Sequence, residues 1–340
     1  MKLSIVDQSP VPEGFTPADA LRNSIDLARL ADRLGYERYW IAEHHATGSF
    51  ASSAPEILIA RVAAETAHIR VGSGGVMLPH YSPLKVAEVF RMLHALYPAR
   101  IDLGIGRAPG GSPLDTFALR RDRNNRTMPD DFPQQMAELM AFLSASFPAE
   151  HPFREIQLSP AMPGGPEVWL LGSSMWSAAA AAQFGVPYAF AHFIDPTHTR
   201  AALKYYHAHV NRQGSAMAGR TVLALGAICA ETEALAQRLY SSVRAWAQRL
   251  RQGGGRGAIP SPERALAQLG SSYERLPNDT GEWPRVLVGE PKRLHAELTR
   301  IAEELHIDEI MIVTVVYEHQ ARRRSYELLA EAFGLEPRTA

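Results

Sequence analysis

The chain has 340 residues, of which 46% are hydrophobic and 21% charged, a balance that is typical of a globular enzyme. Its formal charge of −1 gives no electrostatic reason to expect a nucleic acid or an acidic membrane surface as a partner. The sequence has neither an apolar run of bilayer length nor a signal peptide, so we expect a cytoplasmic protein.

Short strand-like segments alternate with amphipathic helical segments along the chain. The predicted strands cover residues 3–7, 38–43, 69–77, 101–106, 168–171, 187–190, 222–229 and 309–313. Helices are predicted over residues 17–34, 54–66 and 83–96. Regular alternation is typical of parallel strands connected by helices. Eight such strands without a domain boundary predict an α/β fold, a single (β/α)8 TIM barrel domain over residues 1–340; a doubly wound sheet is the alternative.

Individual residues mark helix ends and one core position. Thr16-Pro17, Ser82-Pro83 and Asp195-Pro196 each place a side-chain oxygen before a proline, as at the start of a helix. Gly35 and Gly214 are expected just after helices. The single cysteine, Cys229, excludes an internal disulfide, and its apolar neighbours predict an unreactive core residue.

Two long segments interrupt the alternation. Residues 107–132 follow the fourth strand, and residues 251–285 follow the seventh helix. Long loops in a compact domain are usually functional or disordered. We expect the first segment to be a lid over an active site, hinged at Gly110-Gly111. Several arginines lie beyond this hinge, namely Arg120, Arg121, Arg123 and Arg126.

Glycines in the third and fourth strands predict open space inside the barrel. Side chains of a strand alternate between its two faces. Gly72 and Gly74 share one face of the third strand, and Gly104 and Gly106 share one face of the fourth, with aliphatic residues opposite. Inward-facing glycines would leave room for a flat ring system near the mouth. The alternative is that they only permit tight strand packing.

Two adjacent histidines, His44 and His45, follow the second strand. One of them is a candidate general acid or base, because an unperturbed imidazole titrates near neutral pH. The alternatives are a structural role and metal binding, which ranks last because adjacent strand residues point in opposite directions. The polar residues expected nearby are Asp7, Glu43, Arg70 and Asp102.

A serine-rich turn opens the helix after the fifth strand. It contains Gly172, Ser173, Ser174, Met175 and Ser177. Backbone N–H groups and hydroxyls at a helix N-terminus form a phosphate site, and Arg107 at the end of the fourth strand is a bidentate phosphate partner. An ordinary N-cap is the alternative, since serine is common there without a ligand.

Five stretches of the chain together resemble the luciferase-like flavin monooxygenases. They are LSIVDQSP at 3–10, YWIAEHHATG at 39–48, IRVGSGGVMLPHYSPLKVAE at 69–88, RIDLGIGRAPGG at 100–111 and LLGSSMWSAAAAAQFGVPYAFAHF at 170–193. The resemblance follows nearly the whole chain in order. It implies a barrel that binds reduced FMN at its mouth, and related enzymes on this fold use a deazaflavin instead.

The resemblance also implies roles for residues. His44 matches the catalytic histidine of the family, and Gly74-Gly75 match a non-proline cis peptide beneath the flavin ring. The implied phosphate site consists of Arg107, Gly172, Ser173, Ser174, Met175 and Ser177. The chain departs from luciferase at Gly106, where luciferase has a reactive cysteine, and in the loop after Arg107. Light emission is therefore not implied.

We expect a monooxygenase that uses reduced FMN and O2 to oxygenate a small organic substrate, with no metal. The chain lacks a glycine-rich dinucleotide fingerprint, so a separate flavin reductase is the expected source of reduced FMN. The alternatives are a deazaflavin-dependent dehydrogenase, a flavin-binding barrel without turnover, and a metal-dependent hydrolase. We expect a homodimer that pairs through helices 54–66 and 83–96.

Overall fold

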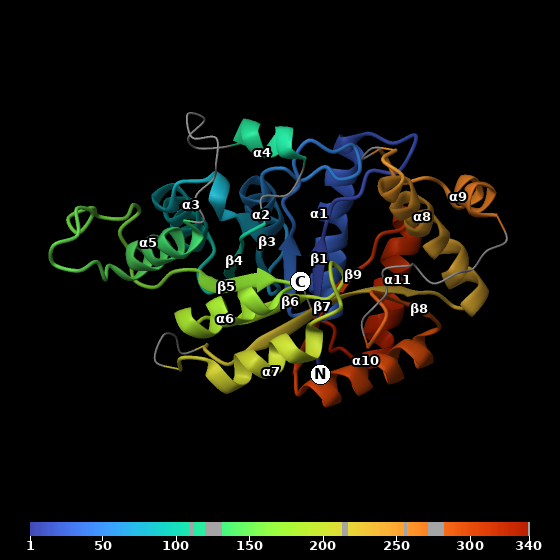
Figure 1. Cartoon of the computed structure of the whole chain (residues 1–340). Helices are drawn as coiled ribbons and strands as arrows, with labels where there is room; N and C mark the ends of the chain where they lie inside the picture. Colours follow the sequence, from blue (N-terminus) through green and yellow to red (C-terminus); the bar gives the residue numbers. More distant parts are fainter. Residues whose placement is uncertain (109–111, 120–130, 213–216, 255–256, 271–281, 339–340) are drawn as a thin grey trace.

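The computed structural model describes residues 1–340 except 109–111, 120–130, 213–216, 255–256, 271–281 and 339–340. Some positions named above lie outside the described residues: Gly110, Gly111, Gly214, Arg120, Arg121, Arg123 and Arg126. The described part contains a barrel of strands and the helices around it (Figure 1).

The strands form a closed parallel barrel. Their order around the ring is β1 (Lys2–Asp7), β2 (Arg38–Ile41), β3 (Arg70–Met77), β4 (Ile101–Gly106), β5 (Glu167–Gly172), β6 (Tyr188–Ala191), β7 (Thr221–Cys229) and β9 (Glu309–Val313). The ring closes because β9 pairs with both β7 and β1. The predicted (β/α)8 barrel is confirmed, and residues 309–313 form its last strand as predicted.

One strand, β8 (Val286–Gly289), is not predicted from the sequence. It pairs with the second half of β7, from Gly226 to Cys229, whereas the first half of β7 pairs with β6. Four residues are too few to show a periodic pattern. β8 is therefore an addition to the eight-stranded ring.

Helices cover the outside of the barrel (Figure 1). They are α1 (Pro17–Leu34), α2 (Pro55–Ala64), α3 (Pro83–Leu96), α4 (Pro113–Leu119), α5 (Phe132–Ser144), α6 (Met175–Phe184), α7 (Thr199–His209), α8 (Glu233–Arg251), α9 (Pro262–Leu269), α10 (Pro291–Leu305) and α11 (His319–Phe333). A 3-10 turn, η1 (Leu78–His80), follows β3. α4 and α9 lie within the two long segments. No described helix is both long and apolar enough to cross a membrane.

The ends of α1 agree with the sequence signals. The Thr16 hydroxyl accepts a hydrogen bond from the N–H of Asp19 at 3.2 Å, and the Asp19 carboxylate accepts one from the N–H of Thr16 at 2.9 Å. Gly35 ends the helix in the left-handed region, with φ of 88°. Ser82 is the N-cap residue of α3 as predicted, but its side chain makes no capping hydrogen bond.

The start predicted for α7 at Asp195-Pro196 is wrong. The Asp195 carboxylate accepts a hydrogen bond from the N–H of Thr197 at 3.0 Å and forms a turn. The helix begins only at Thr199. A short polar side chain before a proline therefore marks a turn here, which the same residue types also favour.

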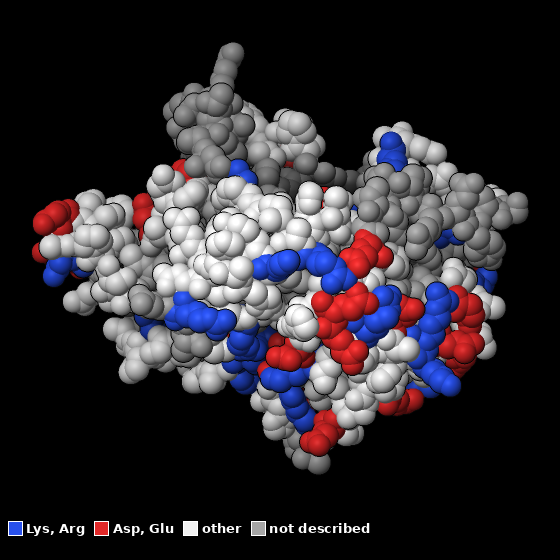
Figure 2. Space-filling view, turned by 60° about the horizontal axis from the view of Figure 1, so that its bottom comes forward, with Lys and Arg blue, Asp and Glu red and all other residues white. Residues whose placement is uncertain are grey.

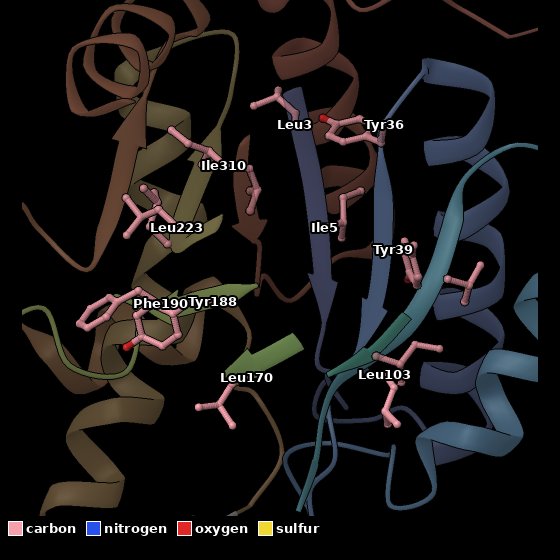
Figure 3. Packing of buried hydrophobic residues seen from close by; sticks show 14 of the residues in the cluster. Leu3, Ile5, Tyr36, Tyr39, Leu103, Leu170, Tyr188, Phe190, Leu223 and Ile310 are labelled. Atoms are coloured by element: carbon pink, nitrogen blue, oxygen red, sulfur yellow. The ribbon is translucent and has the colours of Figure 1, made fainter. Parts of the chain in front are cut away.

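Alternate side chains of the strands pack on the two faces of the barrel wall. Outward-facing residues such as Leu3 and Ile5 pack beneath the helices, as Figure 3 shows. The inward-facing cluster consists of Val6, Trp40, Ala42, Trp169, Ala189, Val222, Ala224, Met311 and Val313. A Cβ added to Gly74 would lie 3.0 Å from the Cβ of Trp40, so this glycine faces the barrel axis as predicted.

Charged side chains fill the N-terminal end of the barrel interior. Buried Arg38 donates hydrogen bonds to Asp102 at 2.8 Å and to Glu309 at 2.9 Å. Arg70 joins the network through Asp102 and lies 2.9 Å from Glu167. The position expected for Arg70 and Asp102, near the histidine pair, is wrong. They lie at the opposite end of the barrel, because each stands at the beginning of its strand.

Figure 2 shows a surface that mixes both signs of charge. Basic and acidic side chains lie beside one another on the lower side of the molecule. Partly exposed ion pairs such as Arg200–Glu304 and Arg300–Glu304 also join side chains of opposite charge. The mixture agrees with the small formal charge and adds no attraction for a polyanion.

Candidate functional site

The floor of the barrel mouth is formed by two tryptophans. Trp40 and Trp169 are fully buried and meet edge to face, with ring centroids 5.4 Å apart. Nε1 of Trp40 donates to Asp102 at 2.8 Å, which connects this floor to the charged end below. The barrel is therefore filled beneath its mouth, and a ligand would enter from the C-terminal ends of the strands.

Small residues line the interior above this floor. Ala42, Gly74, Gly106 and Ala191 occupy inward positions at the ends of β2, β3, β4 and β6. Among the described residues, a Cβ added to Gly106 would come within 4 Å of one atom only, the carbonyl oxygen of Val76 at 3.8 Å. Space bounded by backbone and methyl groups suits a flat ring system.

The peptide bond between Gly74 and Gly75 is cis, as the family resemblance implies. A Cβ on Gly75 would lie 2.8 Å from the backbone oxygen of Gly104, so packing excludes a larger residue there. The register of β3 with β4 also shifts just after Ser73. The mouth therefore presents bare backbone at this point.

His44 and His45 contact different neighbours. The ring of His44 packs against Phe50, with centroids 4.6 Å apart, and its backbone N–H donates to the carbonyl of Ser52 at 2.8 Å. Nε2 of His45 instead lies 2.6 Å from Oε1 of Glu43. Within the described residues, no group of three or more His, Cys, Asp or Glu side chains is arranged to hold a metal ion.

Glu43 connects the ends of β2 and β3. Its buried carboxylate accepts hydrogen bonds from the hydroxyl of Tyr81 at 2.7 Å and from the backbone N–H of Met77 at 3.0 Å. Burial and the nearby Glu43 carboxylate raise the pKa of Tyr81 well above its ordinary value, so the hydroxyl stays protonated. The sequence places Glu43 correctly near the histidines. It gives no signal for Tyr81. This residue follows β3 and η1 in the chain, and only the fold brings its hydroxyl to Glu43.

Further aromatic side chains extend this group along the rim. The ring of Phe50 lies 5.5 Å from that of Trp246 on α8, and Nε1 of Trp246 donates to Ser49 Oγ at 2.9 Å. The N–H of Val11 donates to the Ser49 carbonyl at 2.8 Å, which fixes the loop. Sequence reasoning misses Trp246, because it stands 197 positions from Ser49 and the fold alone brings them together.

The serine turn is a capping box at the start of α6. Ser174 is the N-cap, and its side chain accepts a hydrogen bond from the N–H of Ser177 at 3.3 Å. The buried Ser177 hydroxyl donates to the Ser174 carbonyl at 2.7 Å and lies 2.9 Å from the hydroxyl of Tyr188. A Cβ on Gly172 would lie 2.5 Å from the Cβ of Ser177, so only glycine fits there. Ser174 is thus an N-cap, and this does not decide against a phosphate site, because a cap leaves other N–H groups at the helix start.

The structure brings Arg107 to this turn. Its guanidinium carbon lies 4.1 Å from the ring centre of Trp176, the second residue of α6. Arg107, Ser174 and Met175 are exposed, and Ser173 is half-buried. Arg107 and the turn therefore share the rim at β4 and β5. The histidines occupy the rim at β2, on the other side of β3.

Cys229 is confirmed as a core residue. It is 1% exposed, and burial raises the pKa of its thiol to about 12. A thiol with such a pKa is not a nucleophile near neutral pH. Cys229 therefore has no part in the chemistry at the mouth.

Fold and site define an α/β barrel enzyme scaffold whose mouth is lined by small residues. The model of the luciferase-like monooxygenase family matches residues 1–314. The chain belongs to this family, as the sequence resemblance implies. Membership in a monooxygenase family places the chain among the oxidoreductases.

Curated relatives match nearly the whole chain. The uncharacterized protein YceB of Bacillus subtilis is 40% identical, over 97% of this chain and 99% of the relative. A luciferase-like monooxygenase of Escherichia coli is 38% identical, over 96% and 95%. The N-acetyl-S-alkylcysteine monooxygenase of Bacillus subtilis is 35% identical, over 98% of both chains.

Solved structures share the fold. The crystal structure of apo-MsnO8 has a TM-score of 0.91 and 50% identity, and covers 99% of both chains. The oxygenating constituent of 3,6-diketocamphane monooxygenase from Pseudomonas putida, solved in complex with FMN, has a TM-score of 0.71 and 18% identity. The match to the diketocamphane enzyme covers 100% of this chain and 99% of that enzyme's chain. At 18% identity it shows a shared fold.

Proposed function

We propose that the protein is a flavin-dependent monooxygenase that uses reduced FMN and O2 to oxygenate a small organic substrate. The observation that carries the proposal is the mouth, where bare backbone at Gly74, Gly75 and Gly106 stands above a tryptophan floor. Arg107 and the start of α6 lie on the same rim. This arrangement suits a flat ring with a phosphate tail.

The residues at the mouth fit FMN. Gly74, Gly75 and Gly106 would lie against the ring, because they have no side chains of their own and the space beside Gly106 is open. The phosphate would be held by Arg107 and by the turn formed by Gly172, Ser173, Ser174, Met175 and Ser177. The Ser177 hydroxyl already makes hydrogen bonds with the Ser174 carbonyl and the Tyr188 hydroxyl, so Ser177 would shape the turn.

When bound, reduced FMN supplies the electrons that activate oxygen. The chain's own residues hold the ring, exclude water and move a proton. We assign the proton transfer to His44, which follows β2 at the mouth and matches the catalytic histidine of the family. Its contact with Phe50 would fix the plane of the imidazole ring.

The supply of reduced FMN is assigned to a separate flavin reductase, since the chain has no dinucleotide fingerprint of its own. The proposal includes a cytoplasmic location, a homodimer, and a single domain over residues 1–340.

A thioether is the first substrate to test, because the N-acetyl-S-alkylcysteine monooxygenase is 35% identical to this chain. The protein is supplied with FMN, a flavin reductase and isotopically labelled O2, and a panel of substrates that includes N-acetyl-S-alkylcysteines is offered. We expect one labelled oxygen atom in the product, dependent on both protein and FMN. Substrate oxidation with a deazaflavin and without label would instead establish a deazaflavin-dependent dehydrogenase.

A further inference from the structure

The proposed function gives no role to Glu43, a buried carboxylate at the barrel mouth. Glu43 is 3% exposed. Oε1 accepts from the Tyr81 hydroxyl at 2.7 Å and lies 2.6 Å from Nε2 of His45, and Oε2 accepts from the N–H of Met77 at 3.0 Å. Burial of a carboxylate is costly unless hydrogen-bond donors surround it. These contacts supply donors from three separate places in the chain.

The carboxylate selects one form of the His45 ring. An ionised carboxylate only accepts hydrogen bonds, so Nε2 of His45 must carry the hydrogen between the two groups. In the neutral ring, Nδ1 is then the basic nitrogen. Catalytic triads use a carboxylate in the same way, to hold an imidazole in one tautomer and to stabilise its protonated form.

The surroundings of His45 differ from those of His44. His44 packs against Phe50, whereas the ring of His45 meets His80 edge-on, with centroids 6.3 Å apart. The side chain of His45 is 15% exposed, so it can exchange a proton with the solvent. The titratable groups near it include Glu43, His80 and Tyr81, with Glu56 acting on Tyr81, and His44 precedes it in the chain.

We propose that Glu43 is a positioning residue that orients His45 as a second proton acceptor of the flavin site. This inference rests on the proposed function. Met77, which Glu43 also holds, is two residues beyond Gly75, so one carboxylate fixes both the end of β3 and the imidazole. In the step, Nδ1 of His45 takes a proton from an acidic group of the bound ligand and becomes an imidazolium. Glu43 keeps its negative charge beside it, and the proton then passes to water.

The first test uses the flavin-free protein, with histidine rings labelled for NMR. We expect a far-downfield Nε2–H resonance of His45, assigned by its absence in His45→Gln. The resonance should be lost in Glu43→Gln and retained in Tyr81→Phe, which leaves the carboxylate in place. Absence of the resonance in the wild type, or its persistence in Glu43→Gln, would overturn the orientation by Glu43.

The second test is the rate at which oxidised FMN returns when O2 is mixed with protein-bound reduced FMN. We expect His45→Ala to slow this rate by about 10² and free imidazole to restore part of it. The rate of the Glu43→Gln variant should lie between the rates of the wild type and of His45→Ala. A wild-type rate in His45→Ala, or a loss that imidazole does not reverse, would show that His45 is structural. If the wild type binds no reduced FMN, the proposed function fails, while the NMR result still decides the orientation.

Discussion

At the scale of single residues, Asp7 holds the end of β1 much as Glu43 holds the end of β2. Its buried carboxylate accepts hydrogen bonds from the hydroxyl of Tyr39 and the guanidinium of Arg322. Burial acts to raise the pKa of Asp7, but Arg322 and the hydrogen-bond donors outweigh it, and the pKa lies below its ordinary value. The ion pair connects the C-terminal end of β1 to α11.

Asp7→Asn should lower the free energy of unfolding by about 3–5 kcal/mol, because it leaves the Arg322 charge buried without its partner. Urea denaturation near neutral pH measures this change. The lowered pKa means that the stabilisation is present above pH 3.8, the ordinary value, and is lost as the pH falls through the folded value. The difference between wild type and variant should therefore shrink below pH 3.8. Exposed Asp308→Asn is the control, and equal effects of the two changes would refute the argument.

His44→Ala should slow the return of oxidised flavin by roughly 10²–10⁴, the usual contribution of a general acid or base. Affinity for reduced FMN should change little, because the proposed phosphate contacts lie at β4 and β5. Stopped-flow mixing of the reduced complex with O2 measures the rate. A normal rate would make His44 structural, and loss of FMN would make it a binding residue.

Arg107→Ala should weaken the binding of FMN much more than that of riboflavin, since only FMN carries the phosphate. Anaerobic titration of both reduced ligands measures the two affinities. Arg33→Ala is the matched control, because Arg33 lies in the last turn of α1, far along the chain from the serine turn that opens α6. Equal losses for FMN and riboflavin would remove Arg107 from the phosphate site.

Sequence reasoning finds residues whose position in a strand reveals them and misses residues that act across segments. His44, Glu43 and Arg107 follow strands directly, so a barrel prediction places them at the mouth. Tyr81 and Trp246 reach the rim through contacts between distant segments, and no local pattern reports such contacts. For Arg70 the sequence predicts the correct strand but the wrong end of the barrel.

At the scale of elements, β3 shows most clearly how local sequence determines the mouth. The alternation of glycine with aliphatic residues correctly predicts which face of β3 and β4 points toward the barrel axis. The bulge after Ser73 follows from the register with β4, which only the folded sheet defines. β8 and the start of α7 are missed because a four-residue strand and an Asp-Pro pair both give ambiguous local signals.

Gly106→Leu should leave the fold intact and abolish FMN binding. Space surrounds the added Cβ, with one described contact at 3.8 Å, so the side chain would project into the proposed flavin seat. Gly75→Ala should instead lower the melting temperature, because its Cβ would lie 2.8 Å from a backbone oxygen, and overpacking typically costs about 1–3 kcal/mol. Thermal unfolding and FMN titration separate the two effects. Undiminished FMN affinity in Gly106→Leu would place the flavin elsewhere.

At the scale of the whole molecule, closure of the ring explains why distant motifs meet. Parallel strands end at one edge, so the loops after β2, β3, β4 and β5 share one rim. The sequence predicts this convergence because the strand–helix alternation implies the barrel. It does not predict the charged network that fills the opposite end, since Arg38, Arg70, Asp102, Glu167 and Glu309 come from five different strands and each strand supplies only one of them.

A homodimer is expected through the outer faces of α2 and α3. Ile57 on α2 is 71% exposed, and Met92 and Leu96 on α3 are 56% and 62% exposed. Light scattering at micromolar concentration should give twice the chain mass, and Met92→Glu combined with Leu96→Glu should shift it toward the monomer. Exposed Leu114→Glu on α4 is the control. A wild-type monomer would contradict the expectation.

The binding of reduced FMN tests the central claim most directly. The purified protein is titrated without oxygen with reduced FMN, reduced riboflavin, a reduced deazaflavin and zinc, each in a separate experiment. A flavin-dependent monooxygenase with its phosphate site at Arg107 and α6 should bind one equivalent of reduced FMN per chain, more tightly than each of the others. Absence of FMN binding, equal affinity for FMN and riboflavin, or preference for the deazaflavin or zinc would contradict the account.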